Sequence, residues 1–114
     1  MVKWDKEMFV KTKHAADGQV ALTLTDLKGF PGMNPKVTLF SHIRLNPGQE
    51  VAYHTHEGEF EIYYILTGSG IYNDNGEEVA VAPGAITYNP TGCGHSLKNT
   101  GSEILEFIAL IVRD

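Results

Sequence analysis

The sequence predicts an all-β protein, a small barrel or sandwich built from about nine or ten short strands. Segments rich in β-branched, leucine and aromatic residues alternate between apolar and polar side chains, as strands with one buried face do. Turn-forming residues interrupt these segments at short intervals, and the chain holds 12 glycines and 5 prolines. No convincing pattern of an amphipathic helix is present.

The composition is that of an ordinary globular protein. A chain of 114 residues fits a single domain over residues 1–114. Hydrophobic residues make up 42% and charged residues 20%, which argues against disorder. The formal net charge of −5 disfavours nucleic acids and anionic membranes as partners, since both require a basic surface.

Three features bear on the cellular compartment. No apolar run is long enough to span a membrane, and the N-terminal residues lack the pattern of a signal peptide. The single cysteine, Cys93, excludes an intramolecular disulfide and fits a reducing environment. We therefore expect a cytoplasmic protein.

The N-terminal third, residues 1–35, is expected to contribute strands and a loop. Residues 1–18 mix charged and apolar side chains, which favours a short strand that covers a sheet edge or crosses to a partner subunit. His14 lies among charged residues, so we expect a solvated surface histidine. Residues 19–25 (QVALTLT) alternate as a strand does.

Glycine and proline predict a loop over residues 29–35. Phe30 and Met33 in this loop would either contact a ligand at the mouth of a barrel or cap the core. The sequence leaves the two alternatives open.

Residues 36–45 are the next predicted strand, which ends at the turn Asn46-Pro47-Gly48. His42 and Arg44 lie two positions apart and share one face of this strand. If that face lined a barrel, both would be candidate ligand-binding residues. An exposed polar face is the simpler interpretation.

The second half of the chain continues with short strands. Asn75-Gly76 between two strand-like segments is a strong hairpin signal. The last segment (EILEFIALIV) is apolar enough to be buried on both sides or to form a dimer interface. The predicted strands are residues 51–56, 60–67, 69–72, 77–81, 85–88 and 103–112.

Metal-ligating residue types cluster around residues 54–61. His54 and His56 are two positions apart, so a strand presents both imidazoles on one face. Glu61 follows His56 at an odd spacing, and the chain must therefore turn or bulge between them, with Gly58 a suitable place. Two imidazoles and a carboxylate that converge within a β structure are typical of a metal site. His95, behind the turn Pro90-Thr91-Gly92, is the candidate third imidazole.

The spacing of these residues resembles the two motifs of the cupin family. The first motif is Gly, five residues, His-x-His, three or four residues, Glu, six residues, Gly, and the second is Gly, five residues, Pro-x-Gly, two residues, His, three residues, Asn. The resemblance is close from about residue 40 to the C-terminus and loose over the first 35 residues. The matching positions are Gly48, His54, His56, Glu61 and Gly68 in the first motif, and Gly84, Pro90, Gly92, His95 and Asn99 in the second.

The resemblance implies a double-stranded β-helix, the jelly-roll barrel of cupins, with residues 36–114 forming the barrel that carries both motifs. It also implies that His54, His56, Glu61 and His95 bind one divalent metal ion. A donor set of imidazoles and a carboxylate without a thiolate suits Fe, Mn, Ni, Co, Cu or Zn, and affinity order alone does not choose among them.

Several neighbouring residues compete for roles at this site. Glu57 and Glu59 are alternative carboxylates, which the resemblance ranks below Glu61. Tyr63 is the candidate catalytic residue, because its hydroxyl could donate to a bound ligand, although filling the core is the simpler role. Tyr53 and Tyr88 are weaker candidates of the same kind. Cys93 is expected to behave as a small apolar residue rather than as a thiolate ligand.

The function predicted from these observations is a metal-dependent enzyme that acts on a small polar substrate. The cupin family includes dioxygenases and isomerases of sugars and keto acids, so both reaction types are candidates. The alternative is a binding module that captures a small sugar or acid in the same barrel without turnover. A homodimer is expected from the resemblance.

Overall fold

The computed structural model describes residues 1–114 and confirms the all-β prediction. Ten strands are present, and the only helical segment is a short 3-10 turn at Asp5–Glu7. No helix has the length and apolarity that a membrane span requires. The strands are β1 (Val10–His14), β2 (Val20–Asp26), β3 (Val37–Leu45), β4 (Glu50–Thr55), β5 (Glu59–Thr67), β6 (Gly70–Asp74), β7 (Glu77–Val81), β8 (Ile86–Asn89), β9 (Gly94–Lys98) and β10 (Leu105–Arg113).

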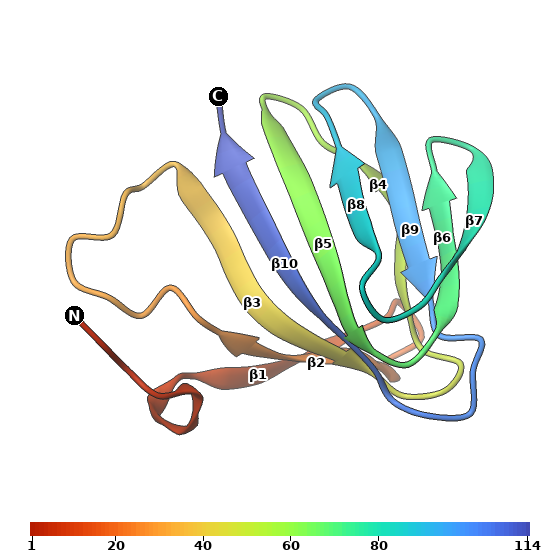
Figure 1. Ribbon diagram of the computed structural model, residues 1–114, viewed down its shortest axis with the longest axis horizontal. Helices are drawn as coiled ribbons and strands as arrows, with labels where there is room; N and C mark the ends of the chain where they lie inside the picture. The colour runs from red at the N-terminus through yellow and green to blue at the C-terminus, as the bar shows by residue number, and fades with distance from the viewer.

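The strands form two antiparallel sheets that are arranged as a jelly roll. The larger sheet has the order β1-β2-β3-β10-β5-β8, and the smaller has the order β4-β9-β6-β7. Figure 1 shows the two sheets as two layers that diverge from each other. Consecutive strands such as β4 and β5 belong to different sheets, which is the connectivity of a double-stranded β-helix. The predicted jelly-roll topology is therefore confirmed. The two sheets do not close into a continuous barrel.

The predicted hairpin is present between β6 and β7. Asn75 and Gly76 both have positive φ, at 51° and 102°, which is the backbone of the tight turn that matches the twist of paired strands. Asp74 pairs with Glu77 directly across this turn. The local signal was sufficient here because the turn chemistry is set by two adjacent residues.

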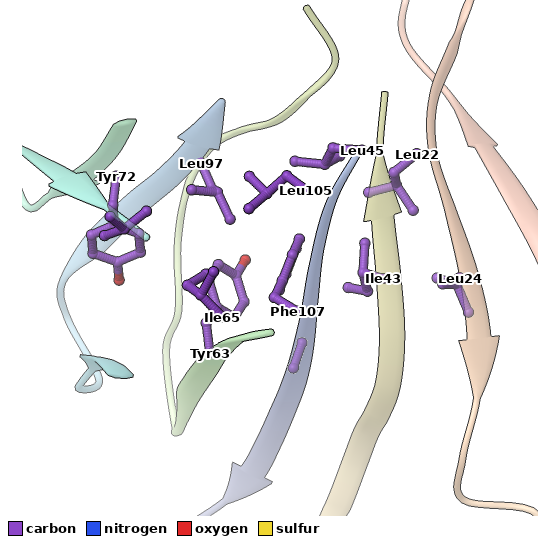
Figure 2. Close-up of a cluster of buried hydrophobic side chains, with 12 residues drawn as sticks. Leu22, Leu24, Ile43, Leu45, Tyr63, Ile65, Tyr72, Leu97, Leu105 and Phe107 are labelled. Atoms are coloured by element: carbon purple, nitrogen blue, oxygen red, sulfur yellow. The ribbon is translucent and has the colours of Figure 1, made fainter. Parts of the chain in front are cut away.

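The hydrophobic core lies between the sheets and centres on β10. Leu105, Phe107 and Ala109 alternate along its inner face with no exposed surface, and β5 adds Tyr63 and Ile65. Figure 2 shows the side chains of this cluster pointing toward one another from both sheets. The outer residues of β10 are half-buried, so the expectation of burial on both faces is not met within one chain.

The N-terminal region resolves two of the alternatives left by the sequence. β1 pairs with β2 at the edge of the larger sheet, so it covers a sheet edge in its own chain. Residues 27–36, between β2 and β3, project away from the space between the sheets in Figure 1. Phe30 and Met33 are half-buried there and do not belong to the core, so neither proposed role of these two residues is met.

Candidate metal centre

His54 reaches the interior because β4 contains a bulge. Val51 pairs with Leu97 and His54 pairs with His95, so three steps on β4 match two steps on β9. The extra residue reverses the parity of the strand, and both Val51 and His54 therefore face the core. The sequence analysis predicted the later break near Gly58 but missed this one.

The turn at Gly58 brings Glu61 back toward His56, as predicted. Gly58 has a φ of +71°, a conformation that favours glycine, and it joins the end of β4 to β5. His56 lies one residue beyond β4 and remains tied to the second-motif loop, because Gly92 N–H donates to its carbonyl at 2.7 Å. Glu61 then faces inward from β5 with only 3% of its surface exposed.

His95 completes the cluster from β9. It is fully buried and lies directly opposite His54. The preceding Gly94 packs against the ring of Tyr53, and a Cβ at this position would overlap that ring. A glycine is therefore required for β4 and β9 to approach closely enough to bring the two imidazoles together.

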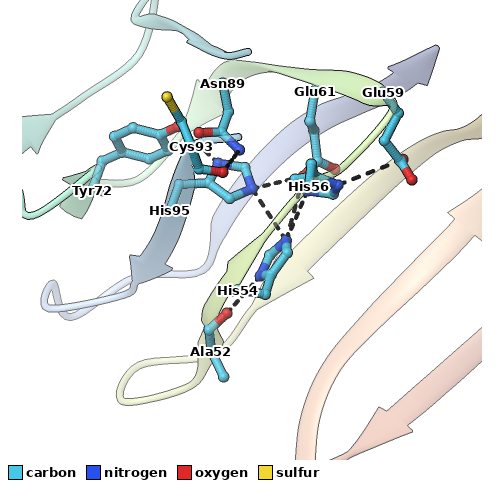
Figure 3. Close-up of polar contacts among 9 residues, drawn as sticks. All are labelled: Ala52, His54, His56, Glu59, Glu61, Tyr72, Asn89, Cys93 and His95. Atoms are coloured by element: carbon cyan, nitrogen blue, oxygen red, sulfur yellow. Dashed lines mark hydrogen bonds and ion pairs between the residues drawn. The ribbon is translucent and has the colours of Figure 1, made fainter. Parts of the chain in front are cut away.

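Four ligand atoms converge at one point, as Figure 3 shows. The Glu61 Oε1 atom lies 2.8 Å from His95 Nε2, 2.9 Å from His56 Nε2 and 3.7 Å from His54 Nε2. His54 Nε2 lies 3.0 Å from His56 Nε2 and 3.2 Å from His95 Nε2. All four atoms lie within 4.8 Å of one another.

These separations suit the ligand shell of a metal ion. An ion with bonds of about 2.0–2.2 Å to nitrogen and oxygen places neighbouring ligands about 3 Å apart in an octahedron. The donor set contains three imidazoles, one carboxylate and no thiolate, which fits a first-row transition metal. The cluster can therefore hold a metal ion, and four protein ligands would leave two positions of an octahedral shell for other molecules.

Comparison with known proteins agrees with this geometry. The family model described as "Cupin domain" matches residues 41–111, which is more than half of the chain. The chain belongs to the cupin family. The sequence-based recognition is therefore confirmed, and the matched region contains both motifs.

Two related proteins come from Thermotoga maritima. An "Oxalate-binding protein" is 42% identical over 95 residues, which cover 83% of this cupin and 78% of the relative. A crystal structure described as a "predicted oxalate decarboxylase" has a TM-score of 0.90 and 37% identity over all of both chains.

More distant structures show the same fold. A sugar phosphate isomerase of the cupin superfamily from Silicibacter pomeroyi has a TM-score of 0.83 at 19% identity, with 99% of this chain and 76% of that chain covered. Identity this low supports the fold and carries no information on the reaction.

The outer ring nitrogens of the cupin's histidines are also held in place. His54 Nδ1 donates to the Ala52 carbonyl at 2.7 Å, which leaves Nε2 free to bind a metal. His95 Nδ1 lies 2.7 Å from the Tyr72 hydroxyl, and His56 Nδ1 lies 3.5 Å from Glu59 Oε2. The sequence analysis treated Glu59 as a competing ligand, whereas the structure places it behind His56.

The sequence analysis did not identify Tyr72, because β6 and β9 are separated by the hairpin and second-motif loop. Burial raises the pKa of Tyr72 to about 12, so the hydroxyl keeps its proton near neutral pH. When His95 Nε2 binds a metal, Nδ1 carries the ring proton and donates to the Tyr72 oxygen. Tyr72 thereby fixes the orientation of a buried ligand.

Replacing Tyr72 by phenylalanine is expected to weaken metal binding by about 10- to 100-fold, the usual cost of losing a partner of a metal ligand. The substitution removes one hydroxyl, and the ring still fills its place in the core. Titration of metal-free protein with Zn²⁺ or Mn²⁺ against a competing chelator measures the change. The matched control is Tyr53→Phe, whose ring is half exposed and makes no contact with a ligand nitrogen through its hydroxyl. Equal losses in both variants would contradict the role assigned to Tyr72.

The cluster is electrostatically coupled even without a metal. Burial by itself would raise the pKa of Glu61, but hydrogen bonds to His54 and His95 and the nearby imidazoles lower it to about 2. The hydrogen bond to Glu61 raises the pKa of His54 above 6.5, against the opposing effect of burial. Near neutral pH the carboxylate is therefore ionised and shared among the three rings.

The metal-free protein is expected to lose stability as pH rises from 6 to 8.5. A raised pKa of His54 stabilises the fold below the unfolded value of 6.5, and this contribution is lost as pH rises through the folded pKa. Glu61 remains ionised over the whole range, because its lowered pKa matters only in strong acid.

Thermal unfolding after chelator treatment measures this loss of stability with pH, and Glu61→Gln should make the stability less dependent on pH. Metal affinity should change in the opposite direction, because the imidazoles must be neutral to bind. An unchanged slope in Glu61→Gln would contradict the assignment.

Tyr63, the candidate catalytic residue, lies beside the cluster. Its ring stacks on His95 with 5.0 Å between centroids and contacts Phe107 at 4.7 Å. Burial and the Glu61 carboxylate raise its pKa well above its usual range, so its hydroxyl is a hydrogen-bond donor and not a base. Tyr63 both fills the core and lines the cavity, and its catalytic role stays a prediction.

The ligand cluster borders a cavity of about 560 Å³ between the sheets. This volume is within the range of small-molecule sites, and most of the wall is hydrophobic. His54 is the most open of the four ligands, with 37% of its side chain exposed. Besides the cluster, the polar or aromatic side chains that line the cavity are Lys13, His14, Tyr53 and Tyr63.

Other candidate residues take structural or surface positions. His42 and Arg44 contact Glu106 and Thr25 on the outer face of the larger sheet, where both are half-buried, so they do not line the cavity and the predicted polar face is only partly exposed. His14 is exposed as expected, but it also lines the cavity mouth, which the sequence analysis did not anticipate. Glu57 and Tyr88 are exposed away from the cluster.

Two residues of the second motif stabilise its loop. Asn99 is buried, and its side-chain amide donates to the carbonyls of Leu45 and Glu103 at 2.9 and 2.8 Å. The Cys93 carbonyl accepts a hydrogen bond from Asn89, and its sulfur points away from the imidazoles in Figure 3. Asn99 therefore fixes the end of the strand that carries His95, and Cys93 is not one of the clustered ligands.

Proposed function

We propose that this cupin binds one divalent transition metal through His54, His56, Glu61 and His95 and uses the metal to bind a small carboxylic acid. The observation that carries the proposal is the convergence of the four ligand atoms beside an accessible cavity, which His54, His56 and Glu61 line. A bound metal would supply Lewis acidity and open coordination positions for the acid. The protein supplies a fixed ligand set and a largely apolar enclosure that limits competing water.

An acid that chelates through two oxygens fits this arrangement. Two free positions on a six-coordinate ion accept a carboxylate oxygen together with an oxygen on the adjacent carbon. The relative that is 42% identical is named as an oxalate-binding protein, which supports oxalate as the first ligand to test. Because oxalate fills only part of a cavity of about 560 Å³, longer dicarboxylates and α-keto acids belong in the same panel.

The test is calorimetric titration with oxalate of protein whose metal content has been measured. Oxalate is expected to bind the metal-loaded protein, and removal of the metal should abolish binding. Acetate, which offers a single carboxylate and no neighbouring oxygen, is the matched control ligand and should bind much more weakly. Oxalate binding of equal strength after complete metal removal would refute the proposal.

Turnover of the bound acid is the second candidate function. The observation in its favour is Tyr63, whose hydroxyl keeps its proton and whose side chain lines the cavity together with Glu61. The dioxygenase and isomerase reactions expected from the sequence stay predictions. Oxygen uptake with a panel of acids, and detection of formate and carbon dioxide from oxalate, distinguish an enzyme from a binding module. Activity lost in Tyr63→Phe with oxalate affinity retained would support a catalytic role for the tyrosine.

We also propose that two copies of the chain pair through the outer face of the larger sheet. Cross-strand partners form two rows on this face, one of Phe40, Leu110, Ile62 and Tyr88 and one of His42, Ile108, Tyr64 and Ile86. Tyr88 and Ile86 are 58% and 72% exposed, which is high for residues of this kind. The two rows contain no carboxylate, and the neighbouring Glu106 lies 3.2 Å from His42, so a partner chain would meet a mostly apolar surface there.

Light scattering coupled to size-exclusion chromatography tests this pairing. The wild-type chain is expected to elute as a dimer, and Tyr64→Glu should convert it to a monomer with unchanged metal content. Val79→Glu on β7, which is also exposed but lies on the smaller sheet, should leave the dimer intact. A monomeric wild-type protein at micromolar concentration would contradict the proposal. The cytoplasmic location stays a prediction.

A further inference from the structure

Lys13 is the only lysine or arginine in the wall of the cavity that borders the ligand cluster. Lys13 on β1 lies opposite Leu22, a buried residue on the inner face of β2, so its side chain emerges on the cavity side. The pairing of β1 with β2 shifts after Lys13, since His14 lies opposite Val20, and such irregularities bend a strand pair. Residues 13–16, which span this bend, form one wall of the cavity.

The position of Lys13 brings its ammonium into the electric field of the ligand cluster. Lys13 lines the same cavity as the cluster residues His54, His56 and Glu61. The lining contains no arginine, no other lysine and no carboxylate besides Glu61. Lys13 is therefore the only permanently positive side chain of the wall that can meet the outer end of an anion bound at the cluster.

The charges of the cavity add to a value that matches a dianion. A divalent ion with the Glu61 carboxylate and three neutral imidazoles carries a net charge of +1. Lys13 raises the total to +2, and a doubly charged acid would make the site neutral. A mostly apolar wall strengthens this preference, because an uncompensated charge is poorly solvated there.

We propose that Lys13 is the residue that selects doubly charged acids over singly charged ones at this cavity. The proposal rests on the proposed function, since it assumes an acid bound at the metal cluster. Each carboxylate of oxalate would place one oxygen at the cluster, and the outward-facing carboxylate oxygens would accept hydrogen bonds from the Lys13 ammonium. The role is one of specificity, and Lys13 contributes no atom to the ligand set of the metal.

The experiment compares two ligands of the same size that differ by one charge. Oxalate and oxamate both chelate through two oxygens, but oxamate has an amide in place of one carboxylate. Calorimetric titrations use the metal-loaded full chain of the wild type, Lys13→Met, Lys13→Arg and Lys11→Met. Lys11 is the matched control, because it lies on the same strand opposite Leu24 but does not line the cavity.

The wild type should prefer oxalate, and Lys13→Met should weaken oxalate by about 5- to 10-fold with little change for oxamate, as expected for a partly solvated charged hydrogen bond. Lys13→Arg should restore most of the preference, and Lys11→Met should match the wild type. Rising ionic strength should weaken oxalate binding more in the wild type than in Lys13→Met. Equal losses for both ligands, or equal effects of the two lysine-to-methionine variants, would overturn the proposal.

Failure of the proposed function has a different signature. If the metal-loaded wild type binds neither oxalate nor oxamate, the choice of oxalate as the ligand in the proposed function fails by itself. The same four proteins are then compared with malonate and succinate as dianions. Binding that does not depend on Lys13, or no binding of either dianion, would overturn the role of Lys13 as well.

Discussion

Replacing His95 by alanine is expected to reduce metal affinity by more than about 100-fold. Loss of a residue that only hydrogen-bonds to a metal ligand costs up to about 100-fold, and loss of the ligand itself should cost more. His95 is fully buried, and its Nε2 atom lies 2.8 Å from Glu61 Oε1 and 3.2 Å from His54 Nε2. Removal of this nitrogen opens one corner of the ligand set and leaves the Glu61 carboxylate with fewer partners. Metal content after dialysis, measured by mass spectrometry, should fall from one ion per chain to almost none.

Two further variants separate loss of the ligand from loss of the fold. His54→Ala should also lose the metal, and its more exposed position makes damage to the core smaller. Glu57→Gln, an exposed carboxylate one residue from His56, should keep one ion per chain. Stoichiometric metal retained by both histidine variants, with a normal circular dichroism spectrum, would exclude the proposed ligand set.

Truncation of Phe107 to alanine is expected to lower the free energy of unfolding by about 3–5 kcal/mol. Phe107 has no exposed surface and packs against the Tyr63 ring on the central strand of the larger sheet. A loss of this size is a large share of the roughly 5–15 kcal/mol that stabilises a typical domain. Urea unfolding followed by circular dichroism measures it on metal-free protein.

The matched control for this prediction is Val79→Ala. Val79 lies on β7 at the edge of the smaller sheet, with 42% of its surface exposed. Truncation there should cost well under about 1 kcal/mol, because an exposed side chain leaves no cavity. Similar losses in the two variants would show that Phe107 is not the centre of the core.

The core and the metal centre share a structural link. The Tyr63 ring lies between Phe107 and His95, with centroid distances of 4.7 and 5.0 Å. A cavity at Phe107 would therefore let Tyr63 move and loosen the packing of a ligand ring. The ligand cluster and the hydrophobic core therefore share Tyr63 as a common packing partner.

The sequence by itself determined most of the strands, the Asn75-Gly76 hairpin and the four clustered ligand residues, but it did not predict β9, the strand that carries His95. These features depend on short-range rules, namely alternation along a strand, the backbone preferences of turn residues and the spacing of two motifs. The break at Gly58 also followed from parity, since His56 and Glu61 could not otherwise share a face.

Only the tertiary structure decided the features that depend on pairing between distant strands. The bulge on β4 that aims His54 inward is visible only in its register with β9. The contact of Tyr72 with His95 joins residues 23 positions apart, and Lys13 approaches the cluster from the opposite edge of the fold. Local patterns specify which way a side chain faces along its own strand, but register and sheet packing decide which side chains it meets.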